Sequence, residues 1–409
     1  SMYAQLSDRA EPAESLRCTS AYYLGETPEA VLVSSEQIRH FRQGGAIQNE
    51  ALKRGVRCAY LLYYKFELAS DKPYSWTIVA DIEQTQTQLA SIAKQLQDPV
   101  VTLTMLNDAV TQDGEELRKL MAASDALQHT AEQNTTVHHY ANVLFNNMRG
   151  GAIADNYKIS AKDYQQSVKQ LNSRVYDLHQ GFFDALPYEL NHKQLINQVT
   201  ELADPQLLRL TLEYLPVTFG RRHGDPSRPW NHFEIKVKDA EGNRLLNYQG
   251  NWRDIFQNWE ALSLSFPGFI PSFIAKFVNA STVDGYNPYR ITKQGIDWEV
   301  VEEDNPWSNI GYWGDHQIIY LLKFLEWSKA YQPAQLQQML SQAVYAYAQV
   351  PYKIKPYQQM LQDAKDTVVF DHKLAAEISQ RVSQFGSDGK LLPDHQGNVY
   401  LCNLMEKIL

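Results

Sequence analysis

The sequence predicts a mainly α-helical protein of stacked helical hairpins, preceded by the end of a β-sandwich. Up to about residue 81, short apolar runs bounded by glycine and proline are typical of strands. Beyond that point, apolar residues recur at helical spacing in segments of about ten to twenty residues. No heptad is sustained along these segments, so the pattern favours helical hairpins over a coiled coil.

The composition narrows the class of protein. The chain has 409 residues, enough for two or three domains or for a single large one. Hydrophobic residues make up 44% and charged residues 21%, as in a soluble globular protein. The formal net charge of -9 argues against a nucleic-acid partner, because such a partner requires a basic surface. The apolar runs are short and interrupted, so we predict no membrane partner.

The cysteine pattern points to a reducing environment. Cys18, Cys58 and Cys402 are odd in number and far apart, which does not suit a disulfide framework. Because the N-terminus also lacks the pattern of a signal peptide, we expect a cytoplasmic protein. No cysteine or histidine spacing typical of a metal site is present, so we predict neither a metal nor a cofactor.

Both ends of the chain suggest a piece of a longer protein. Ser1 before Met2 resembles a cloning scar, and the amphipathic segment 399–409 stops on Ile408 and Leu409 without a cap. We therefore expect the remaining segments of a parent chain to be partners. Apolar surface that those segments would cover should make this chain self-associate, which light scattering would detect.

The first part of the chain contains the strand signals. Residues 1 to about 20 are polar, and we expect them to be loosely ordered. Strands are predicted over 31–35, 58–68 and 74–82, with a short helix near 36–42. Because about three strands cannot bury two faces, the segment is interpreted as the end of a β-sandwich.

Helices follow, with Asp81 as the first predicted N-cap. Further N-caps are predicted at Ser160, Asn191 and Asp204, and a β-hairpin near 232–248. The predicted helices cover 82–96, 102–110, 114–127, 134–148, 160–185, 192–202, 204–215, 252–264, 270–280, 334–350, 357–366, 372–385 and the end of the chain.

Two loops between predicted helices have a composition that suits binding. In 149–157 (RGGAIADNY), two glycines allow either a tight approach to a ligand or a helix C-cap. In 220–230 (GRRHGDPSRPW), Arg222 and His223 belong to a constrained polar loop that either binds an anion or pairs with charges on a neighbouring loop.

The segment 250–262 (GNWRDIFQNWEAL) predicts a helix with two distinct faces. Its apolar stripe consists of Trp252, Ile255, Phe256, Trp259 and Leu262. Arg253, Asp254 and Gln257 lie on the other face. There they could bind vicinal sugar hydroxyls, or they could form a local ion pair on a solvated face.

The segment 295–327 is the richest in chemistry. Its aromatic and acidic residues precede a predicted helix whose apolar stripe is Ile318, Leu321, Leu322 and Leu325. Rings interleaved with carboxylates suit a pocket that stacks sugars, although the same rings could form an ordinary core. The residues of interest are Asp297, Trp298, Glu299, Glu302, Glu303, Asp304, Trp313, Asp315 and His316.

The order of these features resembles that of the six-hairpin glycoside hydrolases and phosphorylases, which have an (α/α)6 barrel. The features are RGG-x-x-x-DNY, WRD-x-x-QNWE and the Trp-Gly-Asp-His helix, after a β-sandwich end and a helical linker. The nearest resemblance is to cellobiose-phosphorylase-type and glycogen-debranching-like enzymes. It implies a β-sandwich end over 1–81, a linker over 82–133 and an incomplete (α/α)6 toroid over 134–409.

The resemblance also implies roles for individual residues. Arg253 and Asp254 would hold the sugar in the reacting subsite, and Trp313, Asp315 and His316 would belong to a second wall of that pocket. The phosphorylases carry a Ser-Asp-Asp pattern at that wall, so inorganic phosphate as a co-substrate is left open. The proton donor of these families lies in a Trp-Asn-Asp motif that this sequence lacks, so we expect the fragment to be inactive alone.

The implied reaction is cleavage or phosphorolysis of a glycosidic bond in an oligosaccharide with inversion. Its acid and base would lie about 6.5 to 9.5 Å apart to admit the nucleophile. Glu299, Glu303 and Asp304 are the candidate bases. Two other interpretations stay open, namely a non-catalytic carbohydrate-binding module and a structural segment. The enzyme interpretation expects the helix starts at Trp252 and Trp313 to converge on one hollow.

Overall fold

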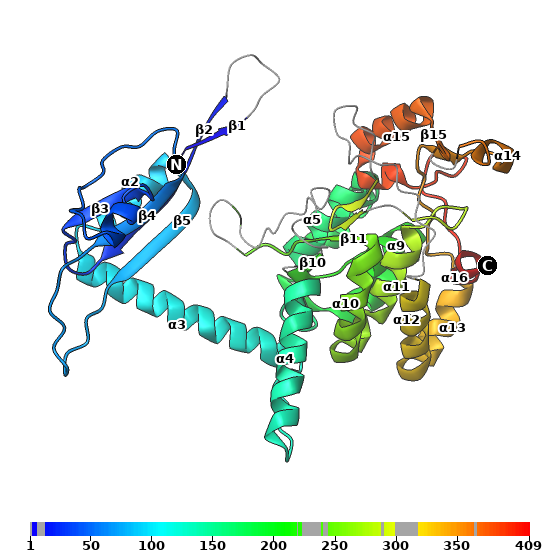
Figure 1. Ribbon diagram of the computed structural model, residues 1–409. Coiled ribbons are helices and arrows are strands. Elements are labelled where there is room, and N and C mark those ends of the chain that lie inside the picture. Colours follow the sequence, from blue (N-terminus) through cyan, green and yellow to red (C-terminus); the bar gives the residue numbers. More distant parts are fainter. Residues whose placement is uncertain are drawn as a thin grey trace. The chain divides into compact units, whose positions relative to one another are not determined.

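The structure is a computed structural model and describes residues 2–5, 13–218, 220–222, 239, 244–287, 290–298, 318–363 and 366–409 (Figure 1). The chain divides into two compact units, Ser1–Glu116 and Leu117–Leu409. The helix α3 (Pro99–Ala123) contains the boundary between them. The described residues are mostly helical with small sheets, which confirms the mainly α prediction.

The first unit contains two small antiparallel sheets. One has the order β1-β2-β5 and the other pairs β3 with β4. The predicted loosely ordered segment is wrong from residue 13 onward, because β2 begins there and pairs with β5 along most of its length. The elements are β1 (Met2–Gln5), β2 (Ala13–Leu24), β3 (Ala30–Ser34), α1 (Ile38–Arg42), β4 (Cys58–Tyr63), β5 (Thr77–Thr85) and α2 (Gln86–Gln95).

The predicted helix start at Asp81 is also wrong. Asp81 pairs with Ser20 inside the sheet, and β5 continues to Thr85. The helix begins at Gln86 because Thr85 and Gln88 form a capping box. The Thr85 hydroxyl accepts from the Gln88 backbone N–H at 3.3 Å, and the Gln88 side chain accepts from the Thr85 N–H at 2.8 Å.

The second unit contains most of the helices. Figure 1 shows α10, α11, α12 and α13 side by side in it. Its helices are α4 (Gln133–Gly150), α5 (Ala161–Leu171), α6 (Ser173–Leu178), α7 (Gln180–Asp184), α8 (His192–Glu201), α9 (Pro205–Glu213), α10 (Trp252–Ser265), α11 (Ile270–Asn279), α12 (Ile318–Tyr331), α13 (Pro333–Ser341), α14 (Tyr357–Met360), α15 (His372–Phe385) and α16 (Leu404–Ile408), with the 3-10 turns η1 (Pro267–Phe269) and η2 (Ser387–Lys390).

The strands of the second unit are short. They form one four-stranded sheet, β10-β11-β12-β13, and three two-stranded pairs. In the ranges that the structure describes, neither a two-sheet sandwich nor a closed toroid is present. The strands are β6 (Ala152–Ile153), β7 (Lys158–Ser160), β8 (Glu189–Asn191), β9 (Val217–Thr218), β10 (Gly220–Arg222), β11 (Tyr248–Asn251), β12 (Arg290–Thr292), β13 (Gly295–Asp297), β14 (Tyr352–Ile354) and β15 (Val368–Phe370). The hairpin predicted near 232–248 falls largely outside the described residues.

Three helix starts confirm the capping predictions. Ser160 Oγ accepts from the backbone N–H of Asp163 at 3.4 Å. Asn191 Oδ1 accepts from Lys193 at 2.9 Å, and Asp204 Oδ1 accepts from Gln206 at 2.8 Å. Each side chain satisfies a donor that the first helical turn leaves without an intrahelical partner.

Three predicted helices are shorter than their apolar periodicity indicated, and one of them, 357–366, is helical only over α14 (Tyr357–Met360). The segment 160–185 is divided into α5, α6 and α7, because Asn172 is extended and its side chain accepts from Val175 N at 3.2 Å. The segment 334–350 is helical only through Ser341. Its remainder pairs with distant residues, Tyr345 with Cys402 and Ala348 with Leu391.

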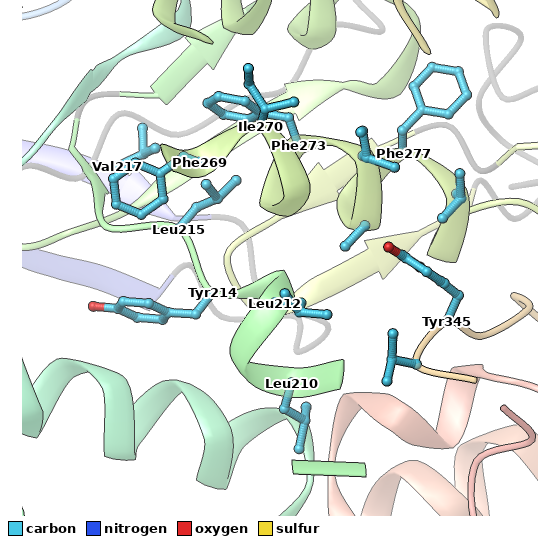
Figure 2. Close-up of a cluster of buried hydrophobic side chains, with 14 of the residues drawn as sticks. Leu210, Leu212, Tyr214, Leu215, Val217, Phe269, Ile270, Phe273, Phe277 and Tyr345 are labelled. Atoms are coloured by element: carbon cyan, nitrogen blue, oxygen red, sulfur yellow. The ribbon is translucent and has the colours of Figure 1, made fainter. Parts of the chain in front are cut away.

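The core of the second unit centres on the contact between α9 and α11. Figure 2 shows Leu212 and Leu215 on one side of this contact and Phe273 and Phe277 on the other. Burying a side chain of this size contributes about 1.5–3 kcal/mol. The helix α11 is buried at every position, so it is the central element of the unit.

A buried charge network lies beside this core. Arg209, with 0% exposure, pairs with Glu213 at 3.0 Å and also with Asp388. Glu213 receives Lys276 at 3.5 Å, and Asp388 accepts from Asn172 Nδ2 at 2.8 Å. Burial raises the pKa of Asp388. Burial also acts to raise the pKa of Glu213, but Lys276 and Arg209 outweigh it and lower that pKa.

All three cysteines are free thiols. Among the helices in the described part of the chain, none combines the length and the apolar character required to cross a bilayer.

We expect Arg209→Met to lower the free energy of unfolding by about 3–5 kcal/mol, because it leaves two carboxylates buried without their shared partner. Chemical denaturation at neutral pH measures the loss. The matched control is Arg244→Met, which removes an exposed ion pair with Asp155 at 3.1 Å and should change stability by less than about 1 kcal/mol. Equal effects of the two variants would contradict the stabilising role of the network.

We expect the stability of the protein to fall as the pH drops from 6.5 to 4, in part because of His192. Burial lowers the pKa of its imidazole from 6.5 to about 4, and its ring lies 4.2 Å from that of Phe269. Between these values the unfolded chain binds the additional proton, so acidification favours unfolding.

The His192→Phe variant should therefore lose less stability over this pH range than the wild type does. Urea midpoints at several pH values test this expectation. The control His138→Phe replaces an exposed imidazole and should keep the pH dependence of the wild type.

Candidate functional site

The helix α10 has the apolar face that its sequence predicts. Trp252, Ile255, Phe256, Trp259 and Leu262 are all buried, which confirms the apolar stripe. Within the stripe the Phe256 ring lies 5.3 Å from that of Trp259. These packed aromatic rings fix the start of the helix against its neighbours.

A cavity of about 290 Å³, here called the α10 cavity, lies beside this helix start. Its walls are the Trp252 ring, the end of α11 with the loop 281–287, the first turn of α12, Tyr347 and the segment 406–409. The described start of α12 contributes Ile318 and Leu321. Residues from distant parts of the sequence therefore meet in one hollow.

A half-buried lysine lies in the wall of the α10 cavity. Lys407 Nζ donates to the Ser281 carbonyl at 3.1 Å and lies 3.6 Å from the centre of the Tyr347 ring. Burial lowers the pKa of Lys407 to about 7, and burial also raises the pKa of Tyr347 to about 12. The charge of this cavity therefore changes near neutral pH.

The α10 cavity combines apolar rings with hydrogen-bonding groups. The buried Trp252 Nε1 has no hydrogen-bond partner among the described residues, although a buried indole N–H usually has one. Asp284 and Glu406 add carboxylates to the same lining. Such a surface can stack a sugar ring and bind its hydroxyls.

The predicted binding residues at this helix start are only partly described. Arg253 and Asp254 occupy the first turn of α10, but their side chains fall outside what the structure describes. The same holds for the side chain of Arg222 in β10. Seven further predicted site residues lie outside the described residues altogether: His223, Glu299, Glu303, Asp304, Trp313, Asp315 and His316.

Two other predicted binding residues do not line the α10 cavity. Gln257 is exposed on α10. Trp298 is half-buried, with the Lys390 ammonium 5.5 Å from its ring. Next to it, Asp297 pairs with Arg290 at 2.8 Å and with Lys390 at 2.5 Å. Burial acts to raise the pKa of Asp297, and the two cations outweigh it and lower that pKa.

The predicted stripe of α12 is only half right. Ile318 and Leu322 are 58% and 53% exposed, whereas the buried face consists of Leu321, Phe324 and Ser328. The reason is tertiary, because Phe324 stacks on Phe273 of α11 at 5.6 Å and thereby sets the rotation of the helix.

Gly150 and Gly151 form the end of α4. Gly151 has φ 86°, a conformation that favours glycine, and its N–H donates to the Asn147 carbonyl at 2.8 Å. Of the two interpretations of 149–157, the C-cap is therefore confirmed.

No sequence pattern indicated Tyr347, Lys407, Asp284 or Glu406. They come from irregular segments and from a short helix, and no motif or spacing connects them. Long-range contacts, such as the pairing of Tyr345 with Cys402 and the hydrogen bond from the Tyr347 hydroxyl to the Glu406 carbonyl at 3.3 Å, bring the segments of Tyr347 and Lys407 together. Within the described residues, no group of His, Cys, Asp and Glu could hold a metal ion.

The chain is therefore mostly helical, and it has a cavity lined by aromatic rings and by hydrogen-bonding groups. Residues 153–216 match the family model of glycoside hydrolase family 149 insertion domain 1. The match runs from the end of β6 through α9 and includes buried core residues such as Tyr164, Phe183 and Leu207. It links this segment to a family of carbohydrate-active proteins. A comparison with characterised proteins found no match.

We expect Lys407 to make the protein more stable as the pH rises from 7 to about 9. Its pKa is 10.5 in the unfolded chain and about 7 in the folded protein, so the unfolded chain binds the additional proton in this range. Above pH 9 the Cys402 thiol acts in the opposite direction, since burial raises its pKa from 9.0 to about 11.

The Lys407→Met variant should lack this rise in stability, as measured by thermal unfolding at several pH values. The control Lys329→Met removes an exposed ammonium and should behave like the wild type. A variant at position 407 with an unchanged pH dependence would show that the ammonium is solvated.

Proposed function

We propose that this chain is part of a carbohydrate-active enzyme, an inverting glycoside hydrolase or phosphorylase, and that the α10 cavity binds its oligosaccharide. The observation that carries the proposal is the meeting of the Trp252 ring and the start of α12 in one cavity. The match of residues 153–216 to a glycoside hydrolase family supports it independently. That family is β-1,3-glucan phosphorylase-like, which makes a β-1,3-linked glucan the preferred substrate class.

In this proposal the rings position the sugar and the charged groups orient it. The half-buried Tyr347 offers apolar surface for a ring face, and Trp252, which is 1% exposed, closes the bottom of the cavity. Arg253 with Asp254 would bind hydroxyls from the first turn of α10. One carboxylic acid would protonate the leaving oxygen while water or phosphate attacks the opposite face. Glu299, Glu303 and Asp304 remain the candidate bases. The acid would belong to another segment of the parent protein, which we place in the cytoplasm.

We expect the chain to bind a β-1,3-linked glucose trisaccharide, and Asp254→Ala to weaken this binding at least tenfold. A hydrogen bond to a charged group is worth about 1.5–3 kcal/mol, and about 1.4 kcal/mol corresponds to a tenfold change. Titration calorimetry measures both constants. The control Asp177→Ala removes an exposed carboxylate on α6 and should bind like the wild type.

A second assay separates an enzyme from a non-catalytic module. It measures sugar release, with and without phosphate, by a chain extended to the full parent protein. Turnover supports the enzyme, whereas binding without turnover supports a non-catalytic carbohydrate module. If neither this chain nor the extended chain binds sugar, the proposal is wrong, and the interpretation that remains is a structural segment.

A further inference from the structure

Lys407, in the wall of the α10 cavity, differs from the other lysines in the described part of the chain. It is half-buried, and none of the described carboxylates forms an ion pair with it. The other described lysines without an ion pair are exposed, so water solvates them. Each remaining buried or half-buried lysine has a carboxylate partner, and these lysines are Lys53, Lys276, Lys293, Lys323, Lys355 and Lys390.

The Lys407 amine has two described neighbours, a carbonyl and a ring. Its Nζ donates to the Ser281 carbonyl at 3.1 Å and lies 3.6 Å from the centre of the Tyr347 ring. The Ser281 carbonyl also accepts from the Ala348 N–H at 2.9 Å, so it has a donor without the lysine. The amine is therefore held in place by a polar contact and a ring face, and neither carries a full charge.

The titratable groups around the amine do not compensate its charge. Asp284 and Glu406 line the same cavity, but neither pairs with Lys407 among the described residues, and Glu406 is engaged in capping α16. Burial raises the pKa of the Cys402 thiol to about 11 and that of the Tyr347 hydroxyl to about 12, so both are neutral at pH 7. An ammonium in this position loses hydration and gains no anion.

These surroundings favour the neutral amine. With a pKa of about 7, about half of the Lys407 side chains are neutral at pH 7, compared with roughly one in three thousand for a solvated lysine. Only the neutral amine has a lone pair that can attack a carbonyl carbon, and desolvated lysines form imines in this way. The cavity of about 290 Å³ beside it has room for a small carbonyl compound.

We propose that Lys407 is a nucleophilic amine that forms a reversible imine with a small hydroxyaldehyde, such as an open-chain sugar, in the α10 cavity. The Nζ lone pair adds to the aldehyde carbon, and the carbonyl oxygen becomes a hydroxyl with a proton from the nitrogen. Loss of this hydroxyl with the second nitrogen proton as water leaves the carbon–nitrogen double bond. The amine chemistry rests on the surroundings of Lys407, whereas the choice of a sugar aldehyde rests on the proposed function.

The same two neighbours suit the product. A protonated imine keeps one N–H, which can donate to the Ser281 carbonyl as the amine does. Its positive charge would lie against the face of the Tyr347 ring, which attracts cations. The contacts that position the amine therefore also stabilise the iminium ion that it forms.

Labelling with glyceraldehyde and cyanoborohydride tests the inference. The reagent delivers hydride to the imine carbon and leaves a stable secondary amine, which peptide mass spectrometry measures at each lysine. At pH 7 we expect Lys407 to be labelled at least tenfold faster than the exposed Lys329 in the same sample. The difference should be smaller than the ratio of neutral fractions, because nucleophilicity falls with the pKa. The ratio should decrease toward pH 10, where Lys329 also becomes neutral.

Variants of Tyr347 test the geometry. Tyr347→Leu leaves the amine open to water and should lower the ratio of Lys407 to Lys329 labelling at least threefold at pH 7, whereas Tyr347→Phe keeps the ring face and should preserve it. The matched control Tyr331→Leu removes an exposed ring from α12 and should leave the ratio unchanged. Equal labelling of Lys407 and Lys329 in the wild type would overturn the inference. So would a ratio that Tyr347→Leu does not lower.

The labelling is independent of the sugar-binding assay. If calorimetry shows no trisaccharide binding while Lys407 is labelled faster than Lys329, the proposed function fails and the reactive amine stands. If the trisaccharide binds in a manner that depends on Asp254 while Lys407 is labelled no faster than Lys329, the reactive amine fails alone.

Discussion

The second unit depends on one buried ion network more than on any other interaction. A guanidinium with 0% exposure can stay in the interior only if carboxylates compensate its charge. Arg209 on α9 meets Asp388 of η2, and Glu213 extends the network to Lys276 on α11. Segments far apart in the chain are therefore held in one arrangement by charges that water cannot screen.

The helix α11 belongs both to this network and to the α10 cavity. It lines the cavity with Phe277 and Val278, and it enters the charge network through Lys276. Asp163 connects α5 to the Tyr214 hydroxyl at the end of α9. One wall of the α10 cavity is therefore an element that the buried network also contacts.

The sequence predicted correctly those features of the fold that depend on contacts between residues close in the sequence. The caps at Ser160, Asn191 and Asp204 and the stripe from Trp252 to Leu262 depend on residues within one or two helical turns, and all were confirmed. The break at Asn172 has a local and a distant part. Its side chain caps α6 through Val175, and its amide also donates to Asp388, which lies 216 positions away in the sequence.

Contacts between distant segments also limited the prediction of the binding cavity. The sequence indicated Trp252 as part of a pocket, but Tyr347 and Lys407 reach that pocket only through long-range contacts of their segments. The sequence gives no sign of the contact between α5 and the turn after β12, since the pair that joins them, Lys293 and Asp163, is 130 residues apart. The rotation of α12 was likewise decided by Phe273 on a neighbouring helix.

Much of the helix α5 is committed to contacts within its unit. Tyr164 and Val168 lie in the core, and Gln165 donates to the Phe183 carbonyl at 2.7 Å. The exposed side chains of the helix are Lys162, Gln166, Lys169 and Gln170. Because an amphipathic helix can vary on the face that water covers, substitutions among homologues should concentrate at these four positions.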